Sequence, residues 1–394
     1  MKGIFSPTST SSDPLTSNGP FVPLPSFDFQ PLGRVIFGPG ALNRLGELAA
    51  SLGNFHNVLV VTDPGLAKVG HPQRAVTLLS NAGFAVHVFD EVKENPTERQ
   101  VIAGTDFARD RRIELIVALG GGSSMDCAKG INFLLTNGGR MADYKGHGKA
   151  TEPMLPSIGI PTTSGTGSEA QSYALITDET THMKMACGDR KAAFRIAVLD
   201  PELTLSQPRG VTAVTAIDAL AHAVESFACT KRTPLSMMAS RTAWSYLEPN
   251  LETVLAVPGN LAARGAMQLG AHFAGMAIEN AMLGICHSCA NPLTAHYGLT
   301  HGIAIGILLP HVVRFNAEHQ PHLYDDLAAS AEHLALRLTA LTEAAGMPTS
   351  LKECEVSRTI LPLLAEEANQ QWTARFNPRT VDDAALLSVY EAAW

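Results

Sequence analysis

Residues 117–126, which read VALGGGSSMD, decide the fold that we expect for this chain. The stretch ends an apolar run, crosses three glycines and begins a segment with helical spacing, so it predicts a strand that turns directly into a helix. Glycines let the backbone approach a ligand closely, and the free N–H groups at a helix start attract a pyrophosphate. The stretch lacks the GxGxxG pattern of dinucleotide sites, and a turn of purely structural use stays open beside the phosphate-binding interpretation.

Short apolar runs on both sides of this stretch predict more strands. They comprise residues 57–62 (NVLVVT), 84–89 (FAVHVF), 113–119 (IELIVAL), 157–160 and 195–199. The first three are continuous and rich in β-branched residues, as expected for strands that are buried on both faces. Segments with helical spacing, such as residues 72–82, lie between them. This alternation predicts parallel βαβ units covered by helices, an α/β arrangement.

The pattern changes in the second half of the chain. From Thr212 to the end, Ala- and Leu-rich segments repeat apolar residues at helical spacing, and β-branched runs fade. We therefore expect a poorly ordered leader over residues 1–30, an α/β domain over residues 31–210 and an all-helical domain over residues 211–394. A boundary at the turn-forming residues 207–210 would leave a cleft between two domains, which is a common place for a ligand.

The composition excludes several function classes. The chain has 394 residues and a formal net charge of −8, so it lacks the basic surplus that favours nucleic-acid binding. It contains no uninterrupted apolar run of about 18 residues, which predicts that it does not span a membrane. Six cysteines are too few for a disulfide scaffold, and the N-terminus lacks the apolar core of a secretory signal. These features predict a soluble protein of a reducing compartment, the cytoplasm.

Acidic and imidazole side chains in the helical half predict a metal site. Asp218 and His222 are four residues apart, which places them on one face of a helix, one turn apart. His287 and His301 follow later in the chain. Three imidazoles and one carboxylate suit Zn²⁺ or Fe²⁺ better than Mg²⁺ or Ca²⁺, which prefer oxygen ligands. The ligand types leave iron and zinc equally open.

His287 and His301 can reach one ion only from separate segments. They are fourteen residues apart, or about 21 Å along a continuous helix, whereas the nitrogens of two imidazoles on one ion lie within roughly 4 Å of each other. Residues 291–292 (Asn-Pro) and 297–298 (Tyr-Gly) are turn-forming and would reverse the chain. Thr300 is a suitable N-cap for a helix that begins at His301.

Two further features follow predicted strands and could contact a nucleotide. Residues 161–169 (PTTSGTGSE) combine hydroxyls and glycines, and Glu169 could complete a capping box at the start of a following helix. Asp63 ends the 57–62 run, where a carboxylate can accept hydrogen bonds from a ribose diol and repel a 2′-phosphate. A helix cap is the structural alternative for Asp63.

Taken together, these motifs resemble the iron-containing, group III alcohol dehydrogenases. The similarity covers nearly the whole chain after the leader. It rests on VIFGPGAL (35–42), VTD (61–63), NPT (95–97), GGGSSMDCAK (120–129), PTTSGTGSE (161–169), VLDPEL (198–203), the D-x-x-x-H pair, HGIAIGILLPHV (301–312) and NPR (377–379). The resemblance implies an N-terminal, Rossmann-like NAD-binding domain and a C-terminal helical metal-binding domain. It also implies hydride transfer between an alcohol and NAD(P), which interconverts the alcohol and an aldehyde or ketone.

The resemblance also assigns residues and partners. It implies Fe²⁺, with Zn²⁺ as the alternative, bound by Asp218, His222, His287 and His301. The implied cofactor contacts are Asp63, Asn95, Gly121, Gly122, Ser123, Thr162, Thr163, Ser164, Thr166 and Lys184. The acidic Asp63 favours NAD over NADP. Small-molecule alcohols or aldehydes are the implied substrates, and a homodimer or larger homo-oligomer is the implied assembly.

One position departs from the family pattern. Relatives commonly carry a proton-relaying histidine four residues after the third ligand, where this chain has Asn291. An amide does not titrate near neutral pH, so either the cofactor ribose and water carry the proton or the substrate differs from a simple primary alcohol. The related classes that stay open as alternatives are lyases or cyclases of the dehydroquinate synthase type, maleylacetate-reductase-like enzymes and glycerol-dehydrogenase-like enzymes.

Overall fold

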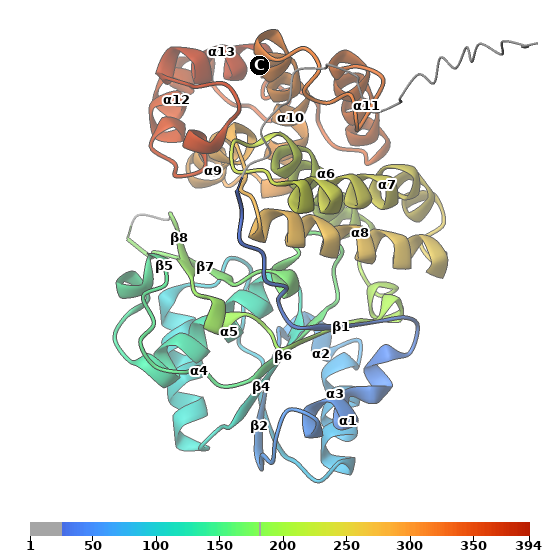
Figure 1. The fold of residues 1–394 in the computed structure, drawn as a ribbon, viewed down its shortest axis with the longest axis vertical. Coiled ribbons are helices and arrows are strands. Elements are labelled where there is room, and N and C mark those ends of the chain that lie inside the picture. The colour runs from blue at the N-terminus through green and yellow to red at the C-terminus, as the bar shows by residue number, and fades with distance from the viewer. Residues whose placement is uncertain (1–25, 181–182) are drawn as a thin grey trace, which may run out of the picture. The chain divides into compact units, whose positions relative to one another are not determined.

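A six-stranded, entirely parallel sheet organises the first half of the chain (Figure 1). The computed structural model describes residues 26–180 and 183–394, so most of the predicted leader lies outside the described residues. The strand order is β1-β9-β6-β4-β2-β3. The strands are β1 (Arg34–Phe37), β2 (Asn57–Val61), β3 (Ala85–Phe89), β4 (Leu115–Gly120), β6 (Ser157–Pro161) and β9 (Ile196–Leu199). The predicted parallel α/β arrangement is confirmed.

Alternating side chains along the central strands build a hydrophobic core on each face of the sheet. Leu59 and Val61 of β2 join one core with residues of α4 and α5. Val58 and Val60 join the other core, with residues of α1 and α3. These helices are α1 (Leu45–Ala50), α3 (His71–Asn81), α4 (Glu98–Asp110) and α5 (Gly122–Asn137). The sheet is therefore covered on both faces, which is what continuous apolar strands require.

The edge strand β3 is less buried than its sequence suggests. Every residue of β4 is buried, and so are four of the five residues of β2. In β3 only Phe89 is fully buried. The prediction of strands buried on both faces is therefore confirmed for β2 and β4 and wrong for β3, because β3 has a neighbouring strand on one side only.

A second, three-stranded sheet does not emerge from the sequence patterns. Its strands β5 (Gly146–His147), β8 (Lys184–Gly188) and β7 (Tyr173–Thr177) lie in that order, with β7 antiparallel to β8. The alternation of buried and more exposed residues in β7 covers only five positions, which is too short to separate a strand from a loop. This small sheet carries Tyr173 and Lys184 to the candidate cofactor site.

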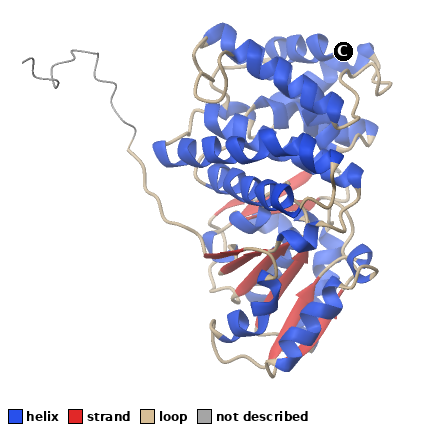
Figure 2. Ribbon diagram, turned by 90° about the vertical axis from the view of Figure 1, so that its right-hand side faces the viewer, coloured by secondary structure: helices blue, strands red, loops and turns tan. Residues whose placement is uncertain are grey.

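The second half of the described chain is almost entirely helical, as predicted (Figure 2). Its helices are α6 (Arg209–Ala228), α7 (Pro234–Ala256), α8 (Leu261–Glu279), α9 (Ile285–Tyr297), α10 (His301–His319), α11 (Ala331–Ala344), α12 (Leu361–Asn369) and α13 (Asp383–Ala393). Helix α6 begins at Arg209, so only the first two residues of the predicted 207–210 turn precede it. Residues Pro31–Trp394 form one compact unit.

Helix α6 is a 20-residue, mostly buried apolar helix of the helical second half. By length and hydropathy it is the one helix among the described residues that could cross a membrane, yet 83% of its most apolar window is buried inside the protein. Ala219 and Leu220, for example, are completely buried. Its composition is therefore accounted for by packing in the helical core. The same helix carries Asp218 and His222 into that core.

Candidate metal and cofactor site

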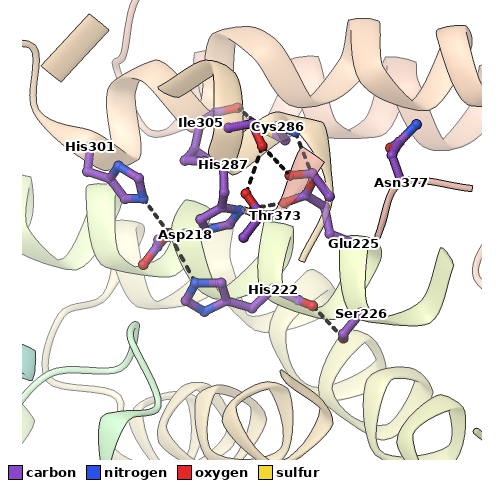
Figure 3. Close-up of polar contacts among 12 residues, drawn as sticks. Asp218, His222, Glu225, Ser226, Cys286, His287, His301, Ile305, Thr373 and Asn377 are labelled. Atoms are coloured by element: carbon purple, nitrogen blue, oxygen red, sulfur yellow. Dashed lines mark hydrogen bonds and ion pairs between the residues drawn. The ribbon is translucent and has the colours of Figure 1, made fainter. Parts of the chain in front are cut away.

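Asp218, His222 and His287 offer ligand atoms that all lie within 4.8 Å of one another, and His301 lies beside them, next to Asp218 (Figure 3). Asp218 and His222 lie on α6, His287 lies in the first turn of α9, and His301 begins α10. Asp218 Oδ1 lies 3.4 Å from the Nε2 atoms of His222 and His287. The Nε2 atom of His301 is 3.7 Å from the same oxygen. One carboxylate oxygen thus faces three imidazole nitrogens.

A left-handed glycine separates His287 from His301. Gly298 has φ 61° and ends α9, after which Thr300 precedes α10 as its N-cap residue. The prediction that the two histidines lie on separate segments is confirmed. The predicted turn at residues 291–292 is wrong, because both lie inside α9. Glycine makes the reversal since it adopts this conformation without the steric cost that other residues meet.

The chemistry of the cluster fits a divalent transition metal. Asp218 Oδ1 and His287 Nε2 are buried and have no well-aligned hydrogen-bond partner among the described residues. An unsatisfied buried polar group costs about 1–3 kcal/mol, so such atoms are rare unless something else pairs with them. A cation bound between one carboxylate and three imidazoles would satisfy them, and this donor set suits Fe²⁺ or Zn²⁺.

Burial and neighbouring charges shift the pKa values of all four residues. Burial favours the neutral form of Asp218, but the neighbouring imidazoles, His222 foremost, hold its pKa well below the usual range. Burial lowers the pKa of His301 to about 3 and also lowers the pKa of His222. For His287, burial acts in the same direction, but Glu225 and Asp218 raise its pKa to about 9.

Glu225 is a site residue that the sequence analysis missed. Its carboxylate accepts hydrogen bonds from His287 Nδ1 and, at 2.7 Å, from the backbone N–H of Cys286 (Figure 3). Glu225 lies seven residues after Asp218 and three after His222, so all three share one face of α6. This spacing was the available signal in the sequence.

A pocket of about 110 Å³ gathers part of the predicted cofactor site. Five predicted contacts line it, namely Asn95, Gly122, Ser123, Thr166 and Lys184. The other five do not line it; they are Asp63, Gly121, Thr162, Thr163 and Ser164. Segments from four parts of the chain therefore converge on the turn before α5, including Lys184 from the small sheet.

The glycines of the 117–126 stretch allow two loops to touch. The stretch forms strand β4, a short turn and helix α5, as predicted. A Cβ atom on Gly122 would lie 2.7 Å from Thr166 Cγ2, and one on Gly121 would lie 3.3 Å from Thr163 Cγ2. Loop packing thus requires glycine at Gly122 irrespective of any ligand. The N–H groups at the start of α5 have no side-chain cap, which is compatible with a phosphate bound there. The phosphate-binding interpretation stays a prediction.

Asp63 caps a helix. Its Oδ1 atom accepts hydrogen bonds from the N–H groups of Gly65 at 2.9 Å and Leu66 at 3.2 Å, at the start of α2 (Pro64–Ala67). The capping alternative is therefore confirmed. The cap uses one carboxylate oxygen only, so a contact between the other oxygen and a ribose stays a prediction.

Asn291 and Glu169 each contact a residue that is distant in the sequence. Asn291 donates a hydrogen bond from Nδ2 to Gln371 Oε1 at 3.2 Å. Glu169 lies in a three-residue 3-10 turn, and its Oε1 atom is 3.1 Å from His272 Nδ1 of α8 in a buried pair. The capping-box prediction for Glu169 is wrong, because no α-helix follows and the carboxylate turns toward α8.

Two family profiles and two named relatives match most of the chain. The family profiles "Iron-containing alcohol dehydrogenase" and "Fe-containing alcohol dehydrogenase family, C-terminal" match residues 33–201 and 212–394. The chain is 38% identical over 311 residues to alcohol dehydrogenase 4 of Schizosaccharomyces pombe, which covers 79% of this chain and 72% of that protein. It is 33% identical over 367 residues to an NAD-dependent methanol dehydrogenase of Bacillus methanolicus, which covers 89% of this chain and 96% of that protein.

The fold is equally similar to a solved structure. A crystal structure of 1,3-propanediol oxidoreductase superposes with a TM-score of 0.90 at 32% identity, covering 94% of this chain and 100% of that chain. The chain therefore belongs to the iron-containing alcohol dehydrogenase family, whose members are metal-dependent alcohol oxidoreductases.

Proposed function

We propose that the protein is an NAD-dependent alcohol dehydrogenase in which Fe²⁺ is held by Asp218, His222, His287 and His301, and that it interconverts a small alcohol and its aldehyde or ketone. The observation that carries this proposal is the buried Oδ1 atom of Asp218, which faces the Nε2 atoms of His222 and His287 at 3.4 Å and of His301 at 3.7 Å. When bound, the metal would polarise the substrate oxygen while the nicotinamide exchanges the hydride.

The chain's own residues would bind and orient the cofactor. The uncapped N–H groups at the start of α5 suit a pyrophosphate, and the dipole of this sixteen-residue helix favours an anion there. Lys184 lines the same pocket and would add a positive charge beside the phosphates. Asn291 donates a hydrogen bond to Gln371 and carries no group that titrates near neutral pH, so it would not relay a proton.

An assay with a panel of alcohols and aldehydes tests this proposal. After elemental analysis of the purified protein, each substrate would be offered with NAD(H) and with NADP(H). We expect metal-dependent turnover with a net change in NADH. Turnover without a net change would instead support the cyclase alternative, and full activity of protein stripped of metal would support the maleylacetate-reductase-like one.

Replacing Asp63 with Asn tests the preference for NAD. Asn caps a helix as well as Asp does, so this variant removes the negative charge and keeps the start of α2. We expect kcat/KM with NADP to rise at least about tenfold relative to NAD, because a charge facing the 2′-phosphate is removed. Steady-state kinetics with both cofactors measures the ratio.

The Asp63→Ala variant is the matched control for the cap. It removes the charge and the cap together, which we expect to cost about 1 kcal/mol of stability in addition. An unchanged ratio of NADP to NAD use in Asp63→Asn would contradict the role of Asp63. That result would not bear on the proposed metal ligands.

We also propose a cytoplasmic location and a homo-oligomeric state. All six cysteines are free thiols, and five of them are buried, which suits a reducing compartment. Cell fractionation tests the location, and light scattering of the purified protein tests the assembly.

A further inference from the structure

We propose that Glu225 is the positioning residue of the metal site: it fixes the His287 ring so that Nε2 faces Asp218, and at the same time it caps the helix that carries His287. This proposal deepens the proposed function and rests on the metal site described there. The Glu225 carboxylate bonds to His287 and to the backbone of Cys286, so it would act on the metal through His287.

Both oxygens of Glu225 are used on the first turn of α9. One accepts from His287 Nδ1, and the other accepts from the backbone N–H of Cys286 at 2.7 Å. A carboxylate has only acceptors, so it can serve these two adjacent donors at once. With Nδ1 held by Glu225, the opposite ring nitrogen, Nε2, points toward Asp218 Oδ1 at 3.4 Å. The orientation of the ring is thus set from outside the cluster.

The start of α9 is shaped to receive this carboxylate. The N-cap residue Gly284 makes no side-chain cap, and a Cβ atom there would lie 3.0 Å from Glu225 Oε1. Glycine therefore leaves the space in which the carboxylate replaces the missing cap. The partial positive charge at the helix start stabilises a buried anion. The Glu225 side chain is only 4% exposed, so water does not compete for its two hydrogen bonds.

The chain contains a second buried Glu–His pair that serves as a matched control. Glu169 and His272 lie 3.1 Å apart, with side chains 4% and 5% exposed, and neither belongs to the four-ligand cluster. Removing either glutamate strips a buried histidine of its carboxylate partner. Only Glu225 is placed to affect a metal.

The test measures metal affinity in the absence of cofactor. Wild type, Glu225→Ala, Glu225→Gln and Glu169→Gln would be stripped of metal and titrated with Co²⁺ and Fe²⁺ against a competing chelator, and the visible spectrum of the Co²⁺-loaded proteins would be recorded. Loss of an outer carboxylate that orients a metal-bound histidine lowers affinity by about 10–100-fold. We expect that loss in Glu225→Ala, with an altered Co²⁺ spectrum.

The conservative variant separates positioning from simple stability. The amide of Glu225→Gln has one acceptor for two donors, so we expect an affinity between those of wild type and Glu225→Ala. Glu169→Gln is expected to lower the melting temperature without changing the affinity or the spectrum. If Glu225→Ala does not fold, the metal affinity and the Co²⁺ spectrum of Glu225→Gln test the proposal instead.

Three outcomes would overturn the proposal. A Glu225 variant that binds metal within twofold of wild type excludes the positioning role while the metal site stands. Equal losses of affinity in Glu225→Gln and Glu169→Gln would mean that both act only through stability. A wild-type protein that binds neither metal would overturn the proposed function and the role of Glu225 together.

Discussion

Replacing Asp218 with Ala is expected to remove the metal and with it nearly all turnover. Asp218 is the only anion among the four proposed ligands, and its Oδ1 atom faces all three imidazoles within 3.7 Å. Without it, a divalent cation would bind to neutral nitrogens in a buried site, where an uncompensated charge is costly. The metal's contribution of several kcal/mol to the transition state corresponds to a loss of at least about 1,000-fold in kcat/KM.

Two further variants sharpen this prediction. Asp218→Asn keeps the shape of the side chain and removes its charge, so a similar loss would show that the charge matters rather than the packing. His311→Ala removes an imidazole from α10 that lies outside the cluster and should retain its metal. Elemental analysis and steady-state kinetics are the measurements. An Asp218→Ala protein with a full complement of metal and wild-type turnover would refute the ligand assignment.

The second large effect concerns stability: Lys129→Met is expected to lower the free energy of unfolding by about 3–5 kcal/mol. Lys129 lies on α5 and is 1% exposed. Its ammonium donates to Ser168 O at 2.8 Å, to Ser168 Oγ at 2.9 Å and to Tyr173 O at 2.7 Å. It also lies 3.9 Å from Asp126 Oδ1. Removing it leaves a buried carboxylate without a counter-charge and frees two backbone carbonyls.

The double variant Asp126→Asn/Lys129→Met tests the cause. Burial raises the pKa of Asp126, and the charge of Lys129 opposes that shift. If the stranded carboxylate is the main cost, neutralising it should restore a large part of the lost stability. Urea unfolding of the two single variants and the double variant gives the coupling energy. Additive losses would show instead that the hydrogen bonds of Lys129, and not its charge, hold this region together.

Local patterns were enough to predict the main sheet and the grouping of the candidate ligands. The β-branched, continuous apolar composition of residues 57–62 and 113–119 predicts buried strands. The four-residue spacing of Asp218 and His222 places both side chains on one face of a helix. A continuous helix would hold His287 and His301 much farther apart than two nitrogens on one ion can be, so the two residues had to lie on separate segments. The structure brings Asp218, His222 and His287 together and places His301 next to Asp218, at 3.7 Å.

Contacts between distant segments were not predictable in the same way. The sequence of β3 has the same apolar pattern as that of β2. Its greater exposure is explained by its place at the edge of the sheet, and that place depends on how all the strands pair. The pairs Glu225–His287 and Glu169–His272 join residues 62 and 103 positions apart. A single sequence contains no periodicity at such separations. For the same reason, Pro292 looked like a turn although it lies within α9.

Because the proposed ligands come from three helices, a bound ion would also act as a reversible cross-link between these helices. An ion held by α6, α9 and α10 would close one long loop of chain between His222 and His287 and one short loop between His287 and His301. Closing a loop of about 15 residues with a disulfide removes unfolded-chain entropy worth about 3 kcal/mol, and metal bonds restrict the chain in a similar sense. Chelation would then expose the α9–α10 connection to proteases, and limited digestion would report metal loss before the rest of the fold opens.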